Sequence, residues 1–66
     1  MEEEYVTEVG RGSKGSLFCK GDKEYRALKV GRTFGGLQIW EIKYGNTIKR
    51  VYLKSRKELK EVIKRL

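Results

Sequence analysis

The chain has 66 residues, one cysteine, no histidine and a formal net charge of +7. These counts exclude an internal disulfide and a zinc site of the usual Cys/His kind. A domain of this size buries only about 60% of the surface that its unfolded chain exposes, so its core is thin. We therefore expect support from a second copy of the chain, that is, a homodimer.

The charge is unevenly distributed along the sequence. Four of the nine acidic residues lie within residues 1–9, so the rest of the chain carries 16 basic and 9 − 4 = 5 acidic residues, a net charge of +11. A body this basic is typical of proteins that bind a polyanion such as nucleic acid. No apolar run approaches the roughly 20 residues of a membrane helix, which predicts an intracellular protein without a membrane partner.

Residues 1–15 are predicted to form an acidic head followed by a flexible arm, outside a single domain at residues 16–66. Tyr5–Val9 is β-prone and could add an edge strand, whereas the glycines and serine of residues 10–15 predict a mobile basic loop. The spacing Gly10-x-Gly12-x-x-Gly15 matches the dinucleotide fingerprint in letters only. That fingerprint requires a strand before it and a helix after it, so we expect no nucleotide cofactor.

From Ser16 onward the pattern alternates as in strands. We predict a strand at residues 16–20, with Cys19 as a small buried residue, then a turn at Gly21-Asp22 and a second strand at residues 24–31. A break at residues 32–36 precedes a third strand at residues 37–44. Gly45-Asn46 then predicts a two-residue type II′ hairpin turn into the fourth strand.

That turn fixes a register, in which Tyr44 lies opposite Thr47 and Trp40 opposite Val51. The register separates the two faces of the sheet. One face is apolar and suited to receive a helix: Gln38, Trp40, Ile42, Tyr44, Val51 and Leu53. The other mixes bases with aromatic and aliphatic side chains: Leu37, Ile39, Glu41, Lys43, Ile48, Arg50, Tyr52 and Lys54. A sheet with one covered face and one basic, partly apolar face is suited to binding nucleotides.

The last segment has the pattern of a capped amphipathic helix. Ser55 and Glu58 have the spacing of a capping box, which predicts that the helix starts at Ser55. Four apolar residues then recur at helical spacing: Leu59, Val62, Ile63 and Leu66. We expect this stripe to pack on the sheet and on the helix of a second chain.

Nothing in the sequence favours catalysis. A histidine base is absent, and Asp22, Glu24, Glu41, Glu58 and Glu61 have ordinary roles in turns, strand pairing and capping. We expect no enzyme activity, no cofactor and no metal site.

The segment Arg32-Thr33-Phe34-Gly35-Gly36 has the strongest functional pattern. An aromatic ring between a base and two glycines suits a base stacking on the ring while the nucleic-acid backbone approaches closely. The alternative is that Phe34 fills the core beneath the strand turn. Trp40 is expected in the core, whereas Tyr44 either braces the hairpin or stacks. The candidate nucleic-acid-binding residues are Lys14, Arg26, Lys29, Arg32, Phe34, Lys43, Arg50, Tyr52 and Lys54.

With the order of four strands and one helix, and with Arg32-Thr33-Phe34-Gly35-Gly36 leading into an alternating basic strand, residues 16–66 resemble the transcriptional coactivator family called positive cofactor four. The resemblance implies a dimer whose curved sheets hold single-stranded or melted DNA with little sequence preference. It implies phosphate binding by Arg32, stacking by Phe34 and a basic contact from Lys43. One extra residue at Gly31, relative to that family, predicts a β-bulge.

We therefore expect an α+β fold: a four-stranded, or with the arm five-stranded, antiparallel curved sheet followed by one helix, in a dimer. The expected function is low-specificity binding of single-stranded DNA in preference to RNA, in a coactivator-like role beside transcription or repair machinery. Two alternatives stay open. One is a duplex-coating chromatin protein or an RNA-binding factor, and the other is a module that binds an acidic protein partner.

Overall fold

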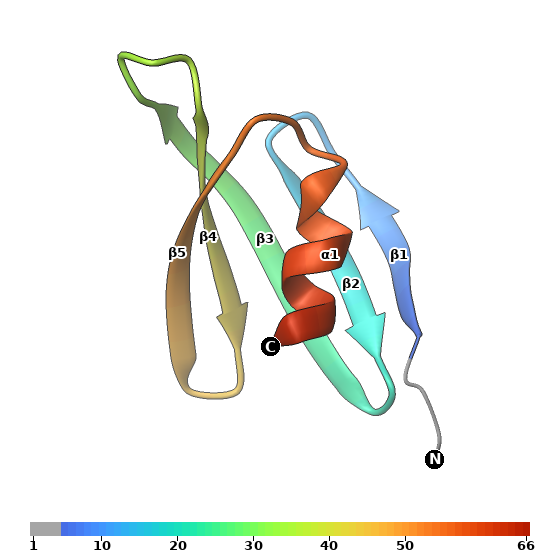
Figure 1. The fold of residues 1–66 in the computed structure, drawn as a ribbon. Helices are drawn as coiled ribbons and strands as arrows, with labels where there is room; N and C mark the ends of the chain where they lie inside the picture. Colours follow the sequence, from blue (N-terminus) through green and yellow to red (C-terminus); the bar gives the residue numbers. More distant parts are fainter. Residues whose placement is uncertain (1–4) are drawn as a thin grey trace.

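The computed structural model describes residues 5–66 and has the α+β architecture expected from the sequence (Figure 1). Five antiparallel strands pair in chain order into one open sheet, and one helix follows them. Strands β1 and β5 are therefore the two edges of the sheet. The elements are β1 (Val6–Arg11), β2 (Gly15–Lys20), β3 (Lys23–Arg32), β4 (Gln38–Tyr44), β5 (Thr47–Leu53) and α1 (Glu58–Arg65).

The two hairpin turns lie where the sequence predicts them. Tyr44 pairs with Thr47 and Trp40 with Val51, so the predicted β4–β5 register is confirmed. Gly45 has φ +56°, as the first position of a type II′ turn requires, because that backbone conformation is open to glycine without steric cost. The turn at Gly21-Asp22 joins β2 to β3, with Lys20 opposite Lys23.

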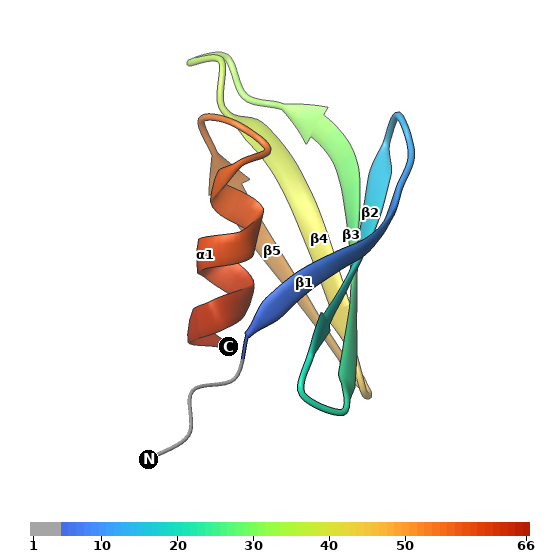
Figure 2. The same ribbon diagram turned by 90° about the vertical axis from the view of Figure 1, so that its right-hand side faces the viewer.

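A bulge is present in β3, one residue before the predicted position at Gly31. Lys29 pairs with Trp40 and Gly31 pairs with Ile39, which leaves Val30 as the extra residue of β3. A bulge bends its strand and increases the local twist. Here it lies just before the β3–β4 loop, and this loop projects from one end of the sheet in both views (Figures 1 and 2).

The prediction of a flexible arm at residues 10–15 is wrong. Gly10 and Arg11 belong to β1 and pair with Leu17 and Ser16, and Gly15 already belongs to β2. The backbone N–H of Gly12 donates to the carbonyl of Gly15 at 2.8 Å, which closes a tight turn. The sheet therefore has five strands, and the expected domain boundary at residue 15 falls inside a hairpin. The acidic residues Glu2, Glu3 and Glu4 lie outside the described residues.

The helix covers one face of the sheet, as predicted (Figure 2). Leu59 and Ile63 are fully buried against the core side chains of the sheet. These are Val6, Phe18, Tyr25, Ala27, Trp40, Ile42 and Leu53. Val62 and Leu66 are partly buried beside them. The apolar stripe is thus largely occupied by the sheet of its own chain, and only Val62 and Leu66 keep apolar surface for a second chain.

The helix begins later than predicted. Residues 55–57 form a turn, and α1 starts at Glu58, where the side chain of the N-cap residue, Lys57, makes no capping hydrogen bond. Half of the predicted capping box is nevertheless present. The Glu58 carboxylate accepts hydrogen bonds from the backbone N–H groups of Lys54 (2.6 Å) and Ser55 (3.0 Å). The carboxylate stabilises the turn that enters the helix, while the Ser55 hydroxyl does not cap it.

Candidate nucleic-acid interface

The face of the sheet turned away from α1 is called the open face here. It is defined by the residues in register with Glu41 and Lys43 on β4. Cross-strand partners on this face form three rows. The first row is Leu17, Arg26, Lys43 and Ile48, the second is Leu28, Glu41 and Arg50, and the third is Ile39 and Tyr52. Aliphatic and aromatic side chains therefore alternate with charges, as predicted. Glu41 lies on it beside Lys43 and Arg50, as predicted, and Glu24 adds a second carboxylate beside Arg26.

Arg26 and Lys43 lie directly opposite each other on β3 and β4. Both are exposed, and in the described chain the ion pairs join other residues, Arg11 to Glu8 and Arg50 to Glu41. Two like charges facing each other across strands destabilise a sheet. Such a pair is stabilised when an anion binds between or above the two cations.

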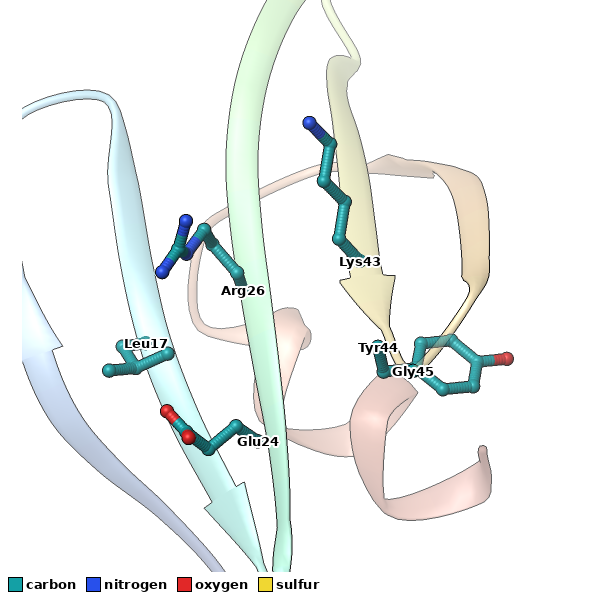
Figure 3. Close-up of a pocket in the computed structure, with 6 residues that line it drawn as sticks. All are labelled: Leu17, Glu24, Arg26, Lys43, Tyr44 and Gly45. Carbon is teal, nitrogen blue, oxygen red and sulfur yellow. The ribbon is translucent and has the colours of Figure 1, made fainter.

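A shallow hollow of about 220 Å³ lies at this cation pair (Figure 3). Leu17, Glu24, Arg26 and Lys43 line it together with Tyr44 and Gly45 of the β4–β5 turn. Figure 3 shows the basic groups of Arg26 and Lys43 above the carboxylate of Glu24, while the Tyr44 ring points away to the side. The hollow can therefore take an anionic group near the two cations and an apolar group against Leu17.

Arg50 is held by its neighbours on the same face. Its guanidinium donates to the Glu41 carboxylate at 3.0 Å. The hydrogen bond to Glu41, followed by that to Tyr52, raises the pKa of Arg50 above its usual value. Arg50 is therefore less available to a phosphate than Arg26 or Lys43. Tyr52 is 53% exposed beside it and presents a ring to solvent.

The β3–β4 loop displays Phe34 at its tip with a side-chain exposure of 113%. The alternative that Phe34 fills the core is therefore wrong. Three hydrogen bonds fold the loop: Thr33 N–H to the Leu37 carbonyl (2.8 Å), Gly36 N–H to the Thr33 carbonyl (3.0 Å) and Leu37 N–H to Thr33 Oγ1 (3.0 Å). A folded loop that exposes a large apolar ring is suited to stacking, since little ordering is required on binding.

The remaining predicted cations lie outside the paired rows of the open face. Lys29 lies opposite Trp40 and Arg32 opposite Gln38, so both alternate onto the helix side of the sheet, contrary to expectation. Lys14 lies in the β1–β2 turn and lines a hollow with Lys29, and Lys54 follows the end of β5. The Lys29 N–H donates to the Lys14 carbonyl at 2.8 Å, Arg32 ends β3 just before the loop with Phe34, and Gln38 pairs with both Arg32 and Leu53, the residue before Lys54. The site thus has two parts, the open face and the end of the sheet at the β3–β4 loop.

Three other side chains can now be assigned. Trp40 is 1% exposed and lies in the core, as predicted. Tyr44 packs its ring on Tyr25 with centroids 4.9 Å apart, so it braces the covered face. Cys19 was expected to be buried, but it is half-buried on the open face opposite Glu24.

Sequence reasoning missed Arg56. One of its guanidinium nitrogens donates to the carbonyls of Gly12 (2.7 Å) and Gly15 (2.6 Å) and to Ser16 Oγ (2.7 Å). The guanidinium also lies 5.4 Å from the centroid of the Trp40 ring. The three hydrogen bonds join residues that are 44, 41 and 40 positions apart in sequence, so no local pattern signals them. Arg56 fixes the turn that was predicted to be mobile.

Comparison with protein-family models, with curated proteins and with solved structures found no match. The resemblance to the coactivator family therefore stays a prediction. Among residues 5–66 no cluster of three or more potential metal ligands occurs, and no helix there is long and apolar enough to cross a membrane.

Proposed function

We propose that the protein binds single-stranded nucleic acid, with DNA preferred to RNA and with little sequence specificity. The observation that carries the proposal is the Arg26 and Lys43 pair: two exposed cations lie opposite each other on the open face, and neither forms an ion pair with a carboxylate among residues 5–66. Phosphates would neutralise these cations. Tyr52 on the same face and Phe34 at the end of the sheet would stack on bases, each stack contributing roughly 1 to 3 kcal/mol.

The arrangement favours an unpaired strand over a duplex. Phe34 and Tyr52 offer ring faces, and a base must leave the helical stack before its own face can contact them. From Arg26 to Arg32, where β3 ends, the strand advances six residues, or about 20 Å at about 3.3 Å per residue, and the loop with Phe34 follows. A short oligonucleotide can span both parts of the site, since modules of this kind cover about 4 to 16 nucleotides.

The first test is fluorescence anisotropy with a labelled 16-nucleotide single strand, a length of about the upper end for one module, over a series of salt concentrations. If about five phosphates are neutralised, log K should fall with log salt at a slope near −3.5. A flat salt response would contradict the proposal. Unlabelled duplex and RNA competitors of equal length separate the duplex-coating and RNA-binding alternatives. Weak binding that does not depend on oligonucleotide length would favour an acidic protein partner instead.

Arg26→Ala and Lys43→Ala are each expected to lower the salt slope by roughly 0.7, because each removes about one phosphate contact from a single strand. Lys60→Ala is the matched control. Lys60 is also an exposed cation, but it lies on α1, on the opposite layer of the molecule. Equal effects of Lys60→Ala and Lys43→Ala would mean that net charge alone determines binding and that the open face is not the site.

Glu41→Gln is expected to strengthen binding. It removes a carboxylate from the open face and weakens the ion pair with Arg50, whose N–O distance is 3.0 Å, so that Arg50 can contact a phosphate. The salt slope should steepen by up to about 0.7. Glu61→Gln makes the same change of charge on the exposed side of α1. Identical gains from the two variants would show that the strand does not pass Arg50.

A further inference from the structure

Among the strands of residues 5–66, β5 is a regular edge of the sheet that pairs only with β4. It pairs with β4 along one side without a register break, and the strand order leaves its other side free (Figure 1). The opposite edge, β1, has a register break between Glu8 and Gly10. Near its start β1 also lies against α1, where Val6 and Lys64 line one hollow. Bulges and covering elements protect an edge from pairing with another chain, so β5 is the edge open to pairing.

The β4–β5 turn determines which backbone groups of β5 point outward. A two-residue turn makes Tyr44 and Thr47 the closing hydrogen-bonded pair, and hydrogen-bonded and non-hydrogen-bonded pairs then alternate. Ile48, Arg50 and Tyr52 fall in the non-hydrogen-bonded pairs, so their N–H and C=O groups face away from β4. Their side chains all lie on the open face, where Ile48 is 62% and Tyr52 is 53% exposed.

These residues form a self-complementary pattern, because Ile48 and Tyr52 lie two residues on either side of Arg50. We propose that β5 of a second copy of the chain pairs antiparallel with this edge, about a two-fold axis at Arg50. Ile48 then lies opposite the partner's Tyr52, and Tyr52 lies opposite the partner's Ile48. An isologous contact requires such symmetry, and aromatic side chains opposite β-branched ones are favourable cross-strand pairs.

The charges of β5 are compatible with this register. The two Arg50 side chains meet at the axis, but each is bound to the Glu41 carboxylate of its own chain at 3.0 Å. Lys49 lies opposite the partner's Val51 and not opposite a second lysine. A helix-to-helix dimer would bury less apolar surface, since Leu59 and Ile63 are already fully buried within their own chain.

The pairing joins two sheets into one and places both open faces on the same side. It does not rest on the proposed function, because the edge is complementary to itself without a ligand. If both proposals hold, two Arg26 and Lys43 pairs lie on one continuous surface, and a longer strand can contact both with a gain in avidity.

The test is light scattering coupled to size-exclusion chromatography over a series of protein concentrations, without nucleic acid. The wild type is expected to have about twice the chain mass of 7.7 kDa at high concentration. Ile48→Pro removes an outward N–H that β4 does not use, and an edge strand tolerates proline at such a position. It should be monomeric where the wild type is dimeric, with an unchanged circular dichroism spectrum.

Two further variants keep the outcome decisive. Tyr52→Lys changes only a side chain and should raise the dissociation constant of the dimer by about tenfold, because two symmetric pairs are weakened. Val62→Lys alters the half-buried part of the helix stripe and should leave the dimer intact. A wild type that stays monomeric, a dimer that survives both β5 variants, or a dimer that only Val62→Lys disrupts would overturn the proposal. Single-strand binding by such a monomer would leave the proposed function standing.

Discussion

Arg56→Ala is expected to lower the free energy of unfolding by about 2 to 4 kcal/mol, from hydrogen bonds to a charged donor and a cation–π contact. The variant leaves the Gly15 carbonyl and the nearly buried Ser16 hydroxyl without this donor. It also removes the guanidinium from the Trp40 ring. The loss is smaller than the sum of these contacts, because the buried Arg56 Nε has no hydrogen-bond partner among residues 5–66 and its desolvation already costs stability.

Urea denaturation measures this change, with two matched controls. Lys57→Ala removes the neighbouring exposed cation and should alter the free energy of unfolding by less than about 0.5 kcal/mol. Arg56→Lys keeps the charge but loses the planar fork, so it should recover only part of the stability. Full recovery by lysine would mean that charge alone, and not the geometry of the guanidinium, holds the β1–β2 turn.

Phe34→Ala is expected to weaken binding of a single strand by about 5- to 150-fold, the equivalent of one lost stack of about 1 to 3 kcal/mol. The salt slope should stay unchanged, because the ring contacts no phosphate. The free energy of unfolding should also change by less than about 0.5 kcal/mol, since the fully exposed ring packs on nothing. This combination separates a ligand contact from a structural role.

Substitutions at the loop tip identify the kind of contact. Phe34→Trp should retain binding, whereas Phe34→Leu, which is apolar without a π-face, should bind nearly as weakly as Phe34→Ala. Thr33→Val removes the Oγ1 acceptor of the Leu37 N–H and loosens the loop, so a smaller loss is expected. Wild-type affinity in Phe34→Ala would remove the loop from the interface and leave the open face alone.

The parts of the fold that local sequence determines were predicted well. Gly45-Asn46 sets a hairpin whose register follows by counting, and the spacing of Leu59 and Ile63 defines the buried side of α1. Both signals operate within a few residues, through turn geometry and helical periodicity. The same hairpin register predicts Glu41 opposite Arg50, which is confirmed, and the two side chains form an ion pair.

The parts that depend on distant contacts were not predicted. Residues 10–15 have the composition of a loop, but Arg56 donates to Gly12 and Gly15 and orders them. The opposition of Arg26 and Lys43 depends on the β3–β4 register, which a bulge shifts and a longer loop does not determine. Because the extra residue Val30 shifts the alternation by one position, Arg32 lies on the helix side of the sheet and not on the open face.

The packing of Arg56 over Trp40 has a practical consequence. Trp40 is the single tryptophan of the chain and lies in the core with a guanidinium 5.4 Å from its ring centroid. The indole is therefore a built-in optical reporter, whose emission follows loss of the native structure as the ring meets water. The sheet backbone lies between the Trp40 ring and the open face. A ligand bound to the open face should therefore leave the wavelength of the Trp40 emission almost unchanged. Unfolding can then be followed by Trp40 emission and ligand binding by the anisotropy of a labelled strand, in the same sample.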